Sequence, residues 1–166
     1  MKHATKTNAA RVLDGLGIAY EIREYDVAPE EFSAIVVAQK IGLPPEQVFK
    51  TLLCVTSERE HLFAVIPGDA ELDFRKLASA AGARRAEMVP VKEVQPLTGY
   101  IRGGVTVLGA KKSFPAIADE TIQLFDVISV SAGARGVQML LSPEDYLRAA
   151  KAAVADLAKS SQEATA

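Results

Sequence analysis

Two β-like runs, Thr51-Leu-Leu-Cys-Val-Thr56 and His61-Leu-Phe-Ala-Val-Ile66, are separated only by the polar segment Ser57-Glu-Arg-Glu60. Both runs are rich in branched and apolar residues, and the segment between them has the polar composition of a turn. The pattern predicts a β-hairpin in the core of a sheet, and Pro67-Gly68 marks its end.

Helical and extended segments follow one another on both sides of this hairpin. Apolar spacing and cap residues predict helices over 7–17, 31–41, 73–81, a short one over 90–97, and one from Ser142 to about Lys159. Alternation predicts strands over 19–25, 84–89, 122–124, 126–131 and 137–141, while 98–115 is rich in glycine and irregular. We therefore expect one α+β domain over 1–159, with a mixed, partly barrel-like sheet flanked by helices, and a short polar, disordered tail over 160–166.

Composition narrows the class of protein. The chain has 166 residues, 49% of them hydrophobic, with 19 basic and 21 acidic side chains and a net charge of -2. This balance excludes a strongly basic protein that coats nucleic acid, although a local basic patch remains open.

Cys54 is the only cysteine, and we interpret it as a core residue; the histidines lack zinc-ligand spacing. The polar N-terminus and the lack of a long apolar run lead us to expect a cytoplasmic protein without membrane segment, metal or cofactor.

Lys50 precedes the first run of the hairpin, at the start of an apolar strand. A lysine in this position usually packs its stem and keeps its ammonium in water. The alternative is a lysine held beside a pocket, where it binds a carbonyl or phosphate oxygen.

Two glycine-rich segments are further candidates. The first segment is Gly103-Gly104-Val-Thr-Val-Leu-Gly-Ala-Lys-Lys, which differs from the Walker phosphate-loop pattern by one residue. No helix signal follows it, so a P-loop nucleoside triphosphatase is a poor interpretation. Its glycines either allow positive φ angles or let the backbone approach a ligand. In Ser131-Ala-Gly133-Ala-Arg135-Gly, the alternatives are a structural turn or a site in which Ser131 donates a hydrogen bond and Arg135 contacts phosphate.

These segments, in this order, resemble the YbaK/EbsC family of aminoacyl-tRNA deacylases, which is related to the editing domain of bacterial prolyl-tRNA synthetases. The shared landmarks are Tyr25-Asp26, 38–43, Phe49-Lys50-Thr51-Leu52, 98–104 with Leu108-Gly109, and 131–136. The resemblance covers about residues 5–155.

The resemblance implies a single α+β domain that removes a wrong amino acid from tRNA, most often cysteine from tRNA(Pro). It makes Lys50 the principal functional residue and places Gly103, Gly104 and Ser131 around the pocket for the terminal adenosine and the aminoacyl ester. Tyr25, Thr51, Gly133 and Arg135 are the further substrate-binding candidates. It also implies the tRNA acceptor end as partner, together with prolyl-tRNA synthetase.

The same resemblance suggests how the ester is cleaved. In the cysteine-specific branch the substrate's own thiol is thought to attack its carbonyl, so the protein needs neither nucleophile nor metal. Among the departures from the family pattern, the histidine often found after Tyr-Asp in that branch is absent, alanines stand at 132 and 134 where glycine and lysine are common, and Gln138 stands where some members have an acidic residue. These departures concern the choice of amino acid, and the one at 134 also removes a contact to tRNA phosphate. Two alternatives remain open, namely removal of alanine or serine by water and a non-catalytic module that binds tRNA or a synthetase.

Overall fold

A computed structural model describes residues 6–28 and 33–160. Five α-helices lie in this part of the chain: α1 (Asn8–Gly15), α2 (Ala34–Ile41), α3 (Phe74–Ala81), α4 (Val91–Thr98) and α5 (Pro143–Ala150). The strands are β1 (Glu21–Glu24), β2 (Phe49–Thr56), β3 (His61–Pro67), β4 (Ala86–Met88), β5 (Ala116–Asp119), β6 (Ile128–Ser131), β7 (Val137–Leu141) and β8 (Ala153–Ala155). Short 3-10 helices are η1 (Pro45–Gln47) and η2 (Glu120–Leu124). The α+β class is confirmed, while the tail over 161–166 and the first two positions of the helix expected over 31–41 lie outside the described residues.

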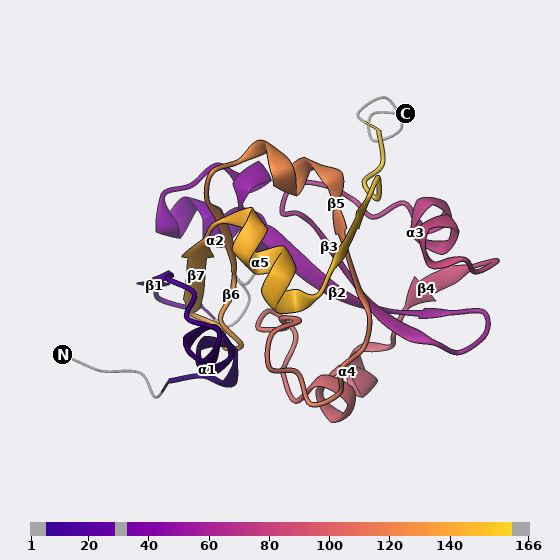
Figure 1. Ribbon diagram of the computed structural model, residues 1–166, viewed down its shortest axis with the longest axis horizontal. Helices are drawn as coiled ribbons and strands as arrows, with labels where there is room; N and C mark the ends of the chain where they lie inside the picture. The colour runs from indigo at the N-terminus through magenta and orange to yellow at the C-terminus, as the bar shows by residue number, and fades with distance from the viewer. Residues whose placement is uncertain (1–5, 29–32, 161–166) are drawn as a thin grey trace.

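The strands form two sheets. A five-stranded mixed sheet has the order β4-β2-β3-β5-β8, and a three-stranded antiparallel sheet has the order β1-β7-β6. A parallel bridge between Val48 and Ser129 joins the two sheets beside the start of β2. In Figure 1 the three-stranded sheet lies on the left, the β2–β3 hairpin extends to the right, and α5 crosses in front.

The predicted hairpin is the centre of the core. Its register runs from Phe49 opposite Pro67 to Val55 opposite His61. Residues 63–66 are all fully buried, because helices and the second sheet cover both faces of β3. Burial of this kind is the main stabilising contribution to a domain of this size.

The two edges of β2 are covered differently. Its inner edge pairs with β3 along the whole strand, whereas its outer edge meets the second sheet only at Val48 and pairs with β4 only over 54–56. The Leu53 carbonyl accepts from the Val89 N–H at 3.0 Å, so the backbone groups of Leu53 point away from β3. Because backbone direction alternates in an antiparallel pair, the N–H and C=O of Thr51 also point to this outer side. The middle of β2 is therefore an open sheet edge.

The loop over 99–109 covers the open middle of β2. Tyr100 is buried, and its hydroxyl donates to the Leu108 carbonyl at 2.7 Å. The β6–β7 turn packs beneath the loop: a Cβ at Gly133 would lie 2.8 Å from the Tyr100 ring, and one at Gly104 would lie 3.1 Å from the Ala134 backbone. Both glycines thus permit the close approach of loop and turn.

The C-terminal helix was predicted too long. α5 starts as expected, with Ser142 capping the Asp145 N–H, but it ends at Ala150, and Lys151 adopts a left-handed conformation with φ 52°. The alanine-rich run over 152–155 favours a helix by propensity, yet it includes β8, which pairs in parallel with β5. Tertiary pairing therefore overrides the local preference.

One strand prediction was wrong, and one further strand was not predicted. Residues 122–124 were expected to be a strand but belong to the 3-10 helix η2. Its start is fixed by Asp119, whose carboxylate accepts from the backbone N–H and the hydroxyl of Thr121. The sequence also gave no signal for β5, because this short strand is buried at every position and does not alternate.

Asp119 also holds the C-terminal segment. It is 1% exposed, and its second oxygen accepts from the backbone N–H groups of Leu157 and Ala158 at 2.8 and 3.0 Å. Burial alone would raise the pKa of this carboxyl, but the hydrogen bonds from Thr121, Leu157 and Ala158 outweigh it and the pKa is lowered. Ionised Asp119 therefore stabilises the fold.

We expect Asp119→Asn to destabilise the protein by about 1.5–3 kcal/mol at neutral pH, the usual contribution of hydrogen bonds to a charged group. Because the folded pKa is depressed, the contribution is present above the unfolded value of about 3.9 and is lost as pH falls through the folded pKa. Urea unfolding at a series of pH values measures this. The exposed Asp126→Asn is the control, and a difference between wild type and Asp119→Asn that stays constant into acid would contradict the assignment.

Candidate active site

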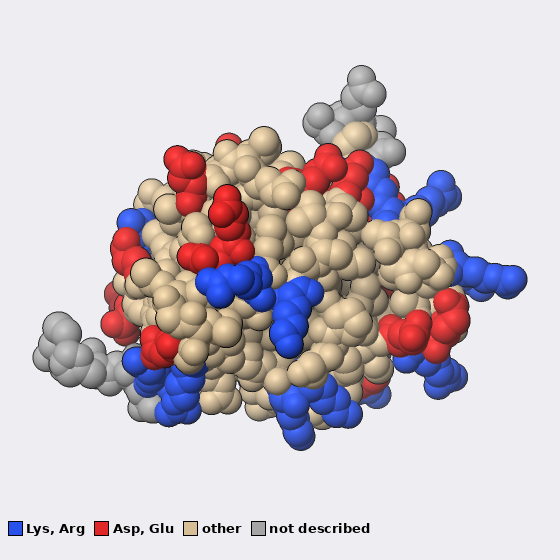
Figure 2. Space-filling view, in the orientation of Figure 1, with Lys and Arg blue, Asp and Glu red and all other residues tan. Residues whose placement is uncertain are grey.

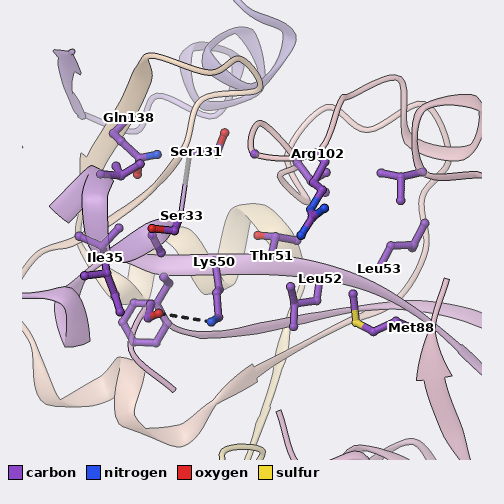
Figure 3. A pocket seen from close by; sticks show the side chains of 18 of the residues that line it. Ser33, Ile35, Lys50, Thr51, Leu52, Leu53, Met88, Arg102, Ser131 and Gln138 are labelled. Carbon is purple, nitrogen blue, oxygen red and sulfur yellow. Dashed lines mark hydrogen bonds between the residues drawn. The ribbon is translucent and has the colours of Figure 1, made fainter. Parts of the chain in front are cut away.

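A cavity of about 410 Å³ lies along the open outer edge of β2. Figure 3 shows Lys50, Thr51, Leu52 and Leu53 following one another along this strand inside it. The wall is formed by β2, α2, the end of β4, α4, the loop over 102–105 and the β6–β7 pair. Its residues are Ser33, Ala34, Ile35, Val37, Val48, Phe49, Lys50, Thr51, Leu52, Leu53, Gly68, Met88, Val89, Val91, Val94, Arg102, Gly103, Val105, Ser131 and Gln138.

The cavity has two chemically different ends. Beside β6 and β7, Ser131 and Gln138 supply polar groups and are 9% and 5% exposed. Beside β4 and α4, the wall is formed by aliphatic side chains such as Met88 and Val91. Lys50 lies between Ser33 and Leu52 in Figure 3.

Lys50 is half-buried, and its Nζ donates to the Gly68 carbonyl at 3.3 Å. Burial lowers the pKa of this ammonium, while the charges of Asp69 and Glu71 act in the opposite direction. Gly68 itself allows this arrangement, because a Cβ there would lie 2.8 Å from both the Ala34 side chain and the Val48 carbonyl. The start of α2 and the end of β3 thus hold the lysine in the cavity wall.

Thr51 contributes backbone groups to the candidate site, more than its side chain. Its hydroxyl is buried and has no hydrogen-bond partner among the described residues. Its N–H and C=O point to the open edge of β2, for the reason given by the strand register. The strand thus offers a donor and an acceptor next to the lysine.

The polar end is held by a small hydrogen-bond network. The Ser129 hydroxyl donates to Oε1 of Gln138 at 2.7 Å, which leaves the amide NH₂ of Gln138 as the group available to the cavity. The Ser131 hydroxyl oxygen accepts from the Gly133 N–H at 3.1 Å, so its own proton remains available for donation. Two neutral donors are therefore fixed at this end.

Four of the eight predicted site residues lie in this wall: Lys50, Thr51, Gly103 and Ser131. The other four do not. Gly104 and Gly133 pack loop against turn, and Tyr25 and Arg135 lie on a separate hollow of about 440 Å³ beside the β6–β7 turn. Arg135 is nevertheless connected to the cavity, because its Nε donates to the Arg102 carbonyl at 2.8 Å.

The sequence prediction missed several wall residues. Arg102 directly precedes the two glycines, and a basic side chain beside a glycine-rich loop could have indicated a site residue. Ser33, Met88 and Val91 come from segments distant in sequence from Lys50 and carry no local signal. Only the tertiary fold brings them together.

The chemistry of the wall is that of binding and polarising oxygen atoms. Its charged members are Lys50 and Arg102, both basic, and its described part contains no histidine, cysteine or carboxylate. Within residues 6–28 and 33–160, no three His, Cys, Asp or Glu side chains form a group able to hold a metal ion. In the same ranges, no helix has the length and hydropathy needed to cross a membrane. Such a wall suits stabilisation of negative charge on an ester or phosphate oxygen.

Comparisons with known proteins agree with this chemistry. The model of the aminoacyl-tRNA editing domain matches residues 28–149. EbsC of Enterococcus faecalis, provisionally named a Cys-tRNA(Pro)/Cys-tRNA(Cys) deacylase, is 41% identical over 146 residues, which cover 88% of this chain and 89% of that protein. The multifunctional Ser/Thr-tRNA deacylase ProXp-y of Escherichia coli K12 is 29% identical over 119 residues, or 69% of this chain and 71% of that protein.

Solved structures share the fold. A protein provisionally described as a trans-editing enzyme for prolyl-tRNA synthetase has a TM-score of 0.81 and 25% identity, with 95% of this chain and all of that chain covered. The hypothetical protein APE2540 has a TM-score of 0.83 at 21% identity, covering 92% of this chain and 99% of that chain. With the family model matching most of the chain, we conclude that this protein belongs to the aminoacyl-tRNA editing domain family and is an aminoacyl-tRNA deacylase of the YbaK/EbsC type.

Proposed function

We propose that this deacylase removes cysteine from mischarged tRNA(Pro), with Lys50 as the essential residue. The observation that carries the proposal is the half-buried Lys50 ammonium in the wall of a cavity at an open strand edge. The cysteine assignment is supported by the similarity to EbsC, which covers most of both chains.

Lys50 acts on the charge that develops during ester cleavage. When a nucleophile adds to the ester carbonyl, the carbonyl oxygen becomes negative, and a fixed ammonium or N–H group stabilises it. Burial strengthens this interaction, because fewer water molecules screen the charge. The Thr51 backbone N–H, which points to the same open edge, is the second donor for this oxygen.

The nucleophile is the substrate's own thiol. Its sulfur forms a bond to the carbonyl carbon, the bond from that carbon to the ribose oxygen breaks, and the thiol proton passes to the ribose oxygen. The products are deacylated tRNA and a four-membered thiolactone, which water hydrolyses to cysteine. A thiol held next to its own carbonyl reacts at a high effective concentration, and nearby positive charge favours the reactive thiolate.

The competing mechanism is attack by water on the ester carbonyl of a substrate whose amino acid has a hydroxyl or methyl side chain. The similarity to ProXp-y, whose name states Ser/Thr-tRNA deacylation, favours this alternative. The two mechanisms differ in whether the substrate must carry a free thiol, and this difference can be tested directly.

We further propose that a synthetase, prolyl-tRNA synthetase for this substrate, supplies much of the tRNA recognition. Affinity for tRNA depends on phosphate neutralisation by basic side chains, and this chain has a net charge of -2. On the face shown in Figure 2, Lys and Arg lie interspersed with Asp and Glu, with uncharged surface between them. Binding of the isolated chain to tRNA(Pro) and to a second tRNA at equal salt tests this, and strong discrimination by the chain alone would contradict it.

We expect Lys50→Met to slow single-turnover cleavage of Cys-tRNA(Pro) by about 10²–10³-fold, the usual effect of removing one donor to a developing oxyanion. Because the folded pKa of Lys50 is lowered, its charge destabilises the native state, so the variant is expected to be at least as stable as wild type. Lys112→Met, at an exposed lysine outside the cavity, is the control. Retained cleavage in a folded Lys50→Met would disprove the assignment.

A methyl group on the substrate sulfur separates the two nucleophiles. If the thiol attacks, S-methylcysteinyl-tRNA(Pro) and Ala-tRNA(Pro) are expected to be cleaved far more slowly than Cys-tRNA(Pro), because neither can form the sulfur–carbon bond. Single-turnover rates of the three esters with one preparation of enzyme measure this. Equal rates for the methylated and free cysteinyl esters would show that water is the nucleophile.

A further inference from the structure

Two buried hydroxyl groups behind β2 have no hydrogen-bond partner. Within residues 6–28 and 33–160, the buried side-chain oxygen and nitrogen atoms that lack a partner are Oγ1 of Thr51 and the hydroxyl oxygen of Tyr146. Tyr146 is 0% exposed and lies on α5 among apolar side chains. An unpartnered buried hydroxyl destabilises a protein, and a phenylalanine at this position would avoid the cost. The hydroxyl of Tyr146 therefore indicates a role other than stability.

The two hydroxyls lie next to each other. Thr51 is directly opposite Val65 in the β2–β3 ladder, and residues in this relation share a face of the sheet. Val65 belongs to the same core cluster as Tyr146, so Thr51 points toward α5, which crosses in front of the sheets in Figure 1. Burial raises the pKa of Tyr146, and the adjacent Thr51 hydroxyl offsets part of this rise. Tyr146 thus keeps its proton at neutral pH and is able to donate a hydrogen bond to Thr51.

Thr51 lacks the backbone anchors that its neighbours in β2 have. Its N–H and C=O point to the open outer edge, so the ladder to β3 does not hold them. The carbonyl of Leu53, which also points outward, accepts from the Val89 N–H. Lys50 lies on the opposite face of the strand and donates to the Gly68 carbonyl. The side chain of Thr51 is therefore the point at which the protein can fix this part of the open edge.

We propose that Tyr146 is a positioning residue of the deacylase. With an ester in the cavity, its hydroxyl donates to Oγ1 of Thr51 and holds the Thr51 N–H in the orientation that the carbonyl oxygen requires. This inference rests on the proposed role of that N–H and adds a residue behind the strand. Hydrogen bonds in active sites are often long in the free enzyme and tighten in the complex, and a small displacement of a donor lowers the rate strongly.

The test is Tyr146→Phe in single-turnover deacylation, on whichever of the Cys-, Ala- and Ser-tRNA(Pro) esters wild type cleaves. The maximal rate is expected to fall by about fivefold, the change that corresponds to one hydrogen bond. The enzyme concentration at half-maximal rate is expected to stay the same, because Tyr146 does not line the cavity. The urea midpoint is expected to be equal or higher, since the substitution removes an unpartnered hydroxyl.

Substitutions at Thr51 identify the partner of Tyr146. Thr51→Val removes the acceptor and keeps the side-chain shape, so it is expected to lower the rate as much as Tyr146→Phe, and the double variant is expected to lose no more than either. Thr51→Ser keeps the acceptor and is expected to lose less than Thr51→Val. The matched control is Tyr20→Phe, which is expected to leave the rate unchanged. Tyr20 packs on the same core cluster, but its hydroxyl donates to Asp14 at 2.9 Å.

An unchanged rate in folded Tyr146→Phe overturns the inference, and so do additive losses in the double variant. A lower urea midpoint with an unchanged rate would make Tyr146 a purely structural residue. If wild type cleaves the alanyl or seryl ester but not the cysteinyl ester, the proposed cysteine specificity fails, while the same variants test Tyr146 on the ester that is cleaved.

Discussion

The open middle of the outer edge of β2 is the feature on which the site depends. A strand edge exposes backbone donors and acceptors, and proteins normally cover or pair them. Here the edge is paired at its start with the second sheet and at its end with β4, and the interval between them is left to the cavity. Lys50 and Thr51 fall in this interval. The same backbone groups that would otherwise invite another strand are thereby available for an ester.

This arrangement requires that the surrounding loops be fixed, because the strand alone cannot define a cavity. The loop over 99–109 is anchored by the buried Tyr100 and packs closely on the β6–β7 turn at Gly104 and Gly133. These glycines do not line the cavity; their role in the structure is to bring Arg102, Gly103 and Ser131 over the strand. A glycine motif in a sequence can therefore mark a site while its members act through packing.

The sequence predicted the parts of the fold that depend on local signals. The β2–β3 hairpin, the Ser142 cap at the start of α5 and the strands near 128–131 and 137–141 all carry such signals in their own residues. The strand β8 does not, because an alanine-rich run has helical propensity and becomes a strand only beside β5. The residues of the site differ in the same way. Lys50 could be identified from the sequence, because it is a lysine at the start of an apolar strand. Met88 and Val91 line the cavity only because β4 pairs with the end of β2.

The burial of Lys50 shows how stability and activity oppose each other in this cavity. Removing the ammonium from water lowers its pKa and weakens the native state, and the Gly68 carbonyl is its hydrogen-bond acceptor. The charges of Asp69 and Glu71 favour the protonated form and offset part of this cost. An exposed lysine would remove the penalty, but water would then screen its charge from the ester. A half-buried lysine at an open strand edge keeps the charge while placing it where a developing oxyanion can use it.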